Sequence, residues 1–239
     1  MYPFSIGVIL DSFRTDLTTA LDKAVAVGAS GLQVYATSGA FSPESLSPQK
    51  RREFLDMCKS RGLTISALCG DLGQGFANPE KNPELIERSK RILDLAKDLE
   101  TDVVTTHIGV VPADTDCDTF RIMQDACGQL AAYADSLRAH FAIETGPELS
   151  ANLVMVAGDD PVKAVHNLKE YIVHTHAKDG RMLRRVNPET IYNGTLDFAE
   201  APFIELPLGE GSVDYPRYLQ ALRDIGYTGF LTIEREVGD

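Results

Sequence analysis

Short apolar runs alternate with longer amphipathic segments along nearly the whole chain. The short runs are rich in β-branched residues, which is typical of strands in a parallel sheet that is buried on both faces. The predicted strands are Phe4–Leu10, Gly31–Thr37, Thr64–Cys69, Asp102–Gly109, Phe141–Thr145, Tyr171–Ala177 and Gly229–Glu236.

Helical periodicity fills the intervals between these strands. Apolar residues recur at helical spacing in Asp16–Ala29, and Ser47 followed by Pro48 has the pattern of a helix N-cap and first turn. Repeated βα units without a linker predict one α/β domain over residues 1–239, a TIM (β/α)8-type barrel. Further helices are predicted from Asn82 onward, over Phe120–Leu137 and over Pro216–Ile225.

The pattern is irregular in two places. A parallel crossover takes about 10–12 residues or more, and the stretch 147–152 before the apolar run LVMVA is too short for one. We therefore expect one βα unit to be missing near 147–152, together with the helix that would follow the last strand. Either the natural protein carries more chain there or the unit is deleted. The stretch Asp179–Ser212 has little periodicity and is predicted to be a surface loop.

Composition narrows the class of protein. With 44% hydrophobic and 24% charged residues, the 239-residue chain can bury a core, which excludes wholesale disorder. No apolar run reaches the roughly 20 residues of a membrane span, and the first residues lack the basic region of a secretion signal. Four cysteines without CxxC spacing predict reduced thiols in a cytoplasmic protein. The net charge of -12 disfavours nucleic acid as a partner.

Polar residues stand at the ends of four predicted strands, where a βα barrel carries its chemistry. Two carboxylates and two or three imidazoles that converge at one mouth would make a divalent-metal site. A histidine at a strand end is also commonly a hydrogen-bonded structural residue, and Glu234 could pair with the neighbouring Arg235. The four residues are His107, Glu144, His176 and Glu234.

Two other segments are less specific. The run GDLGQG at 70–75 lacks the Lys-Ser/Thr of a P-loop, so we interpret it as a loop. The basic residues after the strand that carries His176 could bind a phosphate or carboxylate, or could form a solvated loop. They are Lys178, Arg181, Arg184 and Arg185.

The chain resembles the sugar phosphate isomerase/epimerase family, within the xylose isomerase-like TIM-barrel group that also includes endonuclease IV-type enzymes. The resemblance extends from about Phe4 to Glu236 and is specific for the superfamily rather than for a substrate. The runs that carry it are ETGPE at 144–148, HTHAKDG at 174–180, PLGEGSVDYPRYL at 207–219 and GFLTIERE at 229–236.

This resemblance implies one divalent metal ion, either Mn2+, Mg2+ or Co2+, with Zn2+ as a further option. Similar epimerases hold it with a Glu, an Asp, a His and a second Glu, and Glu144, His176 and Glu234 match three of these ligands. The Asp usually stands in a D-P-A-N motif, and the matching stretch here, 149–152, reads LSAN. The missing Asp thus coincides with the irregularity near 147–152.

The implied activity is isomerisation or epimerisation of a sugar or sugar phosphate by proton transfer next to a carbonyl, through an enediolate. Glu144 and Glu234 would move the proton. Two alternatives remain: a non-catalytic barrel whose metal site has decayed, or an endonuclease IV-like phosphodiesterase. A homo-oligomer is one way to cover a strand edge that a missing unit would expose. The implied substrate-binding residues are His107, His174, Lys178 and Arg181.

Overall fold

The computed structural model describes residues 2–144, 160–187 and 202–235. The chain divides into two compact units, an N-terminal unit formed by Ser5–Glu144 and a C-terminal unit formed by residues 1–4 and 145–239. The predicted gap near 147–152 and the end of the chain lie outside the described residues. A single domain over 1–239 stays a prediction.

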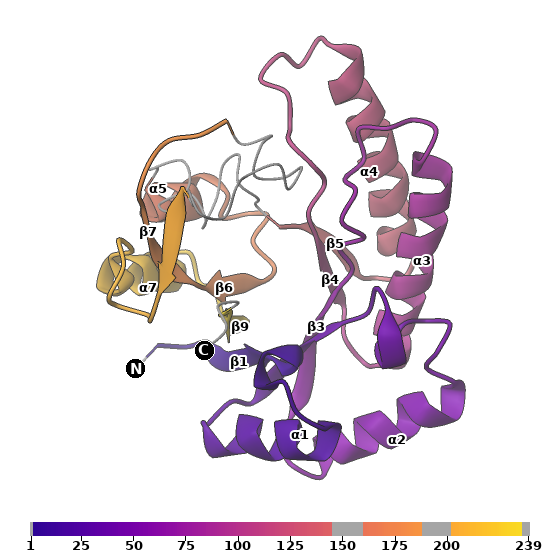
Figure 1. Cartoon of the computed structure of the whole chain (residues 1–239), viewed down its shortest axis with the longest axis vertical. Helices are drawn as coiled ribbons and strands as arrows, with labels where there is room; N and C mark the ends of the chain where they lie inside the picture. The colour runs from indigo at the N-terminus through magenta and orange to yellow at the C-terminus, as the bar shows by residue number, and fades with distance from the viewer. Residues whose placement is uncertain (1, 145–159, 188–201, 236–239) are drawn as a thin grey trace. The chain divides into compact units, whose positions relative to one another are not determined.

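The N-terminal unit is built on a parallel sheet (Figure 1). Each strand pairs with the strand that follows it in the sequence, for example Val8 with Leu32 and Val104 with Phe141. Such an order, without a reversal, is that of a barrel wall rather than of a doubly wound sheet. The strands are β1 (Ser5–Ile9), β2 (Gly31–Tyr35), β3 (Thr64–Cys69), β4 (Val103–Thr106) and β5 (His140–Ile143).

A helix follows each of the first four strands, and local sequence sets where these helices begin. The Asp16 carboxylate accepts the backbone N–H of Thr19, and the Ser47 hydroxyl accepts that of Lys50, so the predicted cap at Ser47 is confirmed. No helix within the described ranges is long and apolar enough to cross a membrane. The helices are α1 (Leu17–Ala26), α2 (Pro48–Lys59), α3 (Asn82–Asp98) and α4 (Asp118–Ser136).

The C-terminal unit places helices α5 (Pro161–Asn167) and α7 (Tyr215–Asp224) against each other. Two of its strands, β6 (Thr175–Ala177) and β9 (Phe230–Ile233), pair in parallel. The buried core of the unit combines residues from both helices and both strands with residues beside them. Its members are Val165, Ala177, Tyr218, Ala221, Leu222, Tyr227 and Leu231.

The C-terminal unit corrects the prediction in three places. The stretch Asp179–Ser212 is not a loop throughout, because β7 (Asp179–Met182) pairs antiparallel with β8 (Phe203–Leu206). The β7 sequence is DGRM, so Met182 is its only large apolar residue and no apolar run marks the strand in the sequence. The predicted strand Tyr171–Ala177 is shorter in the structure, at Thr175–Ala177, and helix α5 is absent from the predicted helices.

One buried carboxylate holds the turn that precedes α7. Asp179, which is 1% exposed, accepts backbone N–H groups from Gly180 at 2.8 Å, Gly209 at 2.8 Å, Gly211 at 3.0 Å and Val213 at 3.1 Å. These four bonds compensate the carboxylate for the loss of water. They also leave no room for a side chain at Gly211, where a Cβ atom would overlap the Asp179 carboxylate.

We expect Gly211→Ala to lower the free energy of unfolding by about 2–3 kcal/mol, because the new methyl group forces the turn away from Asp179. The matched control is Gly128→Ala in α4, where nothing lies within 4 Å of the added Cβ. That change should raise stability by about 0.5–1 kcal/mol, because alanine is the better helix former. Urea unfolding of both variants measures the difference, and equal stabilities would contradict this account of the turn.

Candidate functional site

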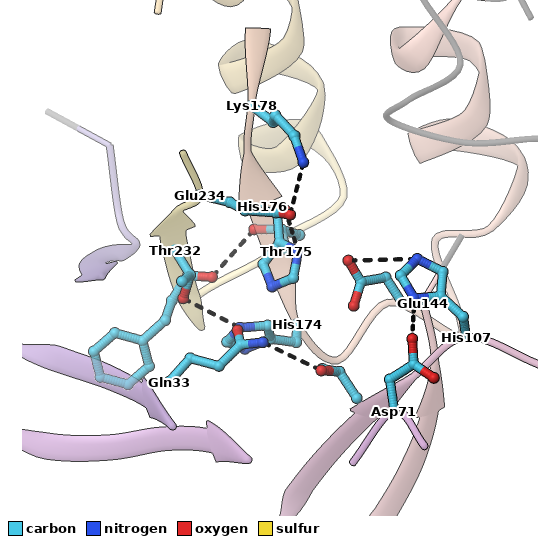
Figure 2. A network of polar contacts seen from close by, with 12 residues as sticks. Gln33, Asp71, His107, Glu144, His174, Thr175, His176, Lys178, Thr232 and Glu234 are labelled. Carbon is cyan, nitrogen blue, oxygen red and sulfur yellow. Dashed lines mark hydrogen bonds and ion pairs between the residues drawn. The ribbon is translucent and has the colours of Figure 1, made fainter. Parts of the chain in front are cut away.

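A buried carboxylate, Glu234, lies between two nitrogen groups in the C-terminal unit (Figure 2). Its Oε2 is 3.0 Å from Nδ1 of His176, and its Oε1 is 2.9 Å from Nζ of Lys178. The side chains are 11%, 10% and 8% exposed for Glu234, His176 and Lys178, respectively. The three groups therefore interact with little screening by water.

The parallel pairing of β6 with β9 brings these residues together. His176 is opposite Thr232 in the register, and the backbone N–H of Glu234 donates to the carbonyl of Ala177 at 3.1 Å. Because parallel strands end at the same edge of a sheet, the residues at their carboxyl ends become neighbours. Arg235 is a candidate partner for Glu234 from the sequence, whereas the structure shows Lys178 in contact with it.

The surroundings keep Glu234 ionised. Burial by itself would raise the pKa of this carboxyl group, but the hydrogen bonds and positive charges of His176 and Lys178 outweigh burial and hold the pKa well below its usual value. An ionised carboxylate next to an imidazole is suited both to binding a metal ion and to accepting a proton.

His174 precedes His176 by two residues, and the two side chains lie on the same side of the chain. Its Nε2 is 3.1 Å from the Thr232 hydroxyl, and its ring meets that of His176 edge to face with centroids 5.4 Å apart. Burial, and then the charge of His176, lowers the pKa of His174 to about 3. His174 is therefore a neutral imidazole at physiological pH.

A second polar group lies at the carboxyl-terminal edge of the sheet in the N-terminal unit. His107, directly after β4, has its Nδ1 2.9 Å from Oδ2 of Asp71 and its Nε2 4.0 Å from Oε1 of Glu144 (Figure 2). Glu144 follows β5, and its N–H donates to the carbonyl of Thr106 at 2.7 Å. Asp71 belongs to the run 70–75, and interpreting that run only as a loop misses this contact.

Arg181, the remaining predicted substrate-binding residue, lies on β7 with an exposed side chain. Its Nη2 is 3.5 Å from the backbone carbonyl of Glu210, which belongs to the turn held by Asp179. The predicted residues of the C-terminal unit thus divide into a buried group around Glu234 and an exposed arginine on β7.

The chain belongs to the xylose isomerase-like TIM barrel family, whose model matches residues 21–238. The predicted α/β barrel class and the resemblance to the sugar phosphate isomerases and epimerases are thereby confirmed. The parallel strand order of the N-terminal unit and the polar residues at its strand ends agree with this family.

Solved structures share the fold. A xylose isomerase domain protein from Planctomyces limnophilus gives a TM-score of 0.77 over 98% of this chain and 91% of that protein, at 20% identity. A D-psicose 3-epimerase gives 0.69 over 98% of this chain and 86% of that protein, at 14% identity. The rhizopine catabolism protein MocC of Rhizobium meliloti is 37% identical over 84 residues, 34% of this chain. The match spans only 24% of that protein's length.

The depressed pKa of His174 predicts a loss of stability in acid. Between its ordinary value of 6.5 and its folded value of about 3, the unfolded chain binds a proton at this position that the folded chain does not. Stability contributed by the neutral ring should therefore fall as the pH drops below 6.5, by about 1–2 kcal/mol between pH 7.5 and pH 5.

His174→Gln removes this titration and should flatten the acid side of the stability profile. Urea unfolding at pH 7.5 and pH 5 measures it, with His166→Gln, a change at an exposed residue of α5, as the control that should follow the unmodified protein. The explanation fails if His174→Gln loses as much stability on acidification as the control does.

Proposed function

We propose that this protein is a metal-dependent isomerase or epimerase of a sugar or sugar phosphate. The observation that carries the proposal is the carboxylate of Glu234, held by His176 and Lys178 at the carboxyl-terminal ends of two parallel strands. In TIM-barrel enzymes this is the edge at which catalysis takes place. That a D-psicose 3-epimerase has the same fold supports the reaction class.

The donor groups fit a divalent metal ion. A metal ligand has to be deprotonated, and Glu234 meets this condition. His176 brings an imidazole ring beside it, with Nδ1 3.0 Å from Oε2 of Glu234. We add Glu144 as the third ligand, because the family's barrel gathers its strand ends at one mouth. Nitrogen and oxygen donors of this kind suit Mn2+, Mg2+, Co2+ or Zn2+.

When bound, the ion would polarise the substrate carbonyl and so make the neighbouring C–H group more acidic. In our proposal, one of Glu144 and Glu234 accepts that proton and the other returns a proton, with an enediolate between the two steps. Lys178 keeps Glu234 ionised and therefore ready to accept.

The remaining predicted residues would bind the substrate. His107 and His174 are suited to hydroxyl groups, since imidazole nitrogens can donate or accept hydrogen bonds. Arg181, exposed on β7, is suited to a negatively charged far end such as a phosphate. The substrate in this proposal is a small sugar or its phosphate.

Two alternatives compete with this proposal. The first alternative is a barrel with a decayed metal site. It is favoured because the stretch 149–152, which lies outside the described residues, has no counterpart of the Asp that the family uses as a metal ligand. The metal content of the purified protein separates that alternative from the enzyme. Phosphodiester cleavage of the endonuclease IV type ranks below both. That reaction needs more metal ligands than a chain with 5 histidines offers. Its nucleic-acid substrate would also be repelled by a net charge of -12.

The test follows deuterium uptake from D2O next to the carbonyl of a panel of ketoses and ketose phosphates, by proton NMR, with Mn2+, Mg2+ or Co2+ present. The unmodified protein should catalyse uptake into at least one sugar. Glu144→Gln and Glu234→Gln should each lose about 100-fold or more of the rate, because the amide cannot accept the proton. Circular dichroism should show that both variants remain folded.

Glu170→Gln, a change at an exposed carboxylate, is the matched control and should leave the rate unchanged. Full activity of both site variants would mean that other residues move the proton. No uptake into any sugar, with no metal in the purified protein, would favour the decayed site.

A further inference from the structure

The glycine-rich run 70–75 is fixed against the strand end that carries His107. The backbone N–H of Phe76 donates to the carbonyl of Ile108 at 2.8 Å. Gly75 adopts a φ of 59°, and a Cβ atom there would lie 2.7 Å from the same carbonyl oxygen. Only glycine allows this approach, so the close packing of two backbones sets where the loop lies.

Asp71 uses its two carboxylate oxygens for different purposes. Oδ1 accepts the backbone N–H of Gly73 at 2.7 Å, which closes a turn within the loop. Oδ2 lies 2.9 Å from Nδ1 of His107, a residue 36 positions away in the sequence. The turn therefore fixes the direction from which the carboxylate meets the imidazole ring.

This contact decides which ring nitrogen of His107 carries the proton. A carboxylate only accepts hydrogen bonds, so the ring proton next to Asp71 has to be on Nδ1. In a neutral ring Nε2 then carries a lone pair. Nε2 is 4.0 Å from Oε1 of Glu144, longer than a hydrogen bond, so this carboxylate does not itself hold a proton on Nε2.

We propose that Asp71 is the positioning residue of His107 and that it makes Nε2 an acceptor for a hydroxyl group of the substrate. An acceptor at this position selects a hydroxyl, which can donate, over a carbonyl or phosphate oxygen, which cannot. The substrate part of this inference rests on the function proposed above, whereas the tautomer of His107 can be measured without any substrate.

The test is the nitrogen-15 NMR spectrum of the imidazole rings in the full chain, labelled at histidine and recorded at a pH where the ring is neutral. Comparison with His107→Gln identifies the signals of His107 among those of the 5 histidines. The expected spectrum has a protonated Nδ1 and an unprotonated Nε2. A neutral ring protonated on Nε2 would overturn the proposal outright, and this arm needs no further variant.

Asp71→Asn is the informative change. Its amide oxygen can still accept the N–H of Gly73, which leaves the amide nitrogen to donate to Nδ1 and moves the ring proton to Nε2. Asp114→Asn is the matched control, because Asp114 caps a similar turn through the N–H of Asp116 in an exposed loop. The control should keep the original tautomer, and an unchanged tautomer in Asp71→Asn would also overturn the proposal.

Kinetics test the substrate part. For the sugar that takes up deuterium, Asp71→Asn should raise KM about tenfold and change kcat by less than about threefold, because a hydrogen bond to the substrate is lost. A reversed tautomer with an unchanged KM would show that Nε2 does not meet the substrate. If no sugar reacts at all, the proposed function fails, while the NMR result still decides the role of Asp71.

Discussion

A carboxylate that is almost removed from water must be compensated, and Glu234 is compensated by an imidazole on one oxygen and an ammonium group on the other. This arrangement depends on the parallel pairing of β6 with β9, which places His176, Lys178 and Glu234 at one edge. The register of β6 against β9 therefore also determines which side chains meet at the candidate site. A slip by one residue would turn His176 to the other face and leave Glu234 without its imidazole.

In the N-terminal unit, parallel strand pairing likewise brings polar residues together. Strands β3, β4 and β5 run parallel, so Asp71, His107 and Glu144, which follow them, lie at a common edge. In both units a carboxylate lies at hydrogen-bonding distance from Nδ1 of a histidine. Orienting an imidazole through one nitrogen directs the chemistry of the other, which is how proteins set histidines that bind metals or substrates.

The sequence predicts what depends on local patterns. Strand β3 occupies Thr64–Cys69 as predicted, and Ser47 caps its helix, because a short apolar run and a helix cap each depend on a few neighbouring residues. Contacts across the chain are less predictable. Lys178 meets Glu234 over 56 positions, and a glycine-rich loop gives no sign that Asp71 reaches His107. Asp179 is similar, since only the folded turn shows that it accepts four N–H groups.

We propose that Glu234 and His176 belong to a metal site. Titration with Mn2+, followed by the electron paramagnetic resonance signal of the free ion, tests it most directly. We expect tight binding of one ion per chain, weakened about 100-fold or more in Glu234→Gln and in His176→Gln. Lys178→Gln should bind at least as tightly as the unmodified protein, because it removes a repelling charge. Binding of Mn2+ by Glu234→Gln as tight as in the unmodified protein would contradict the account.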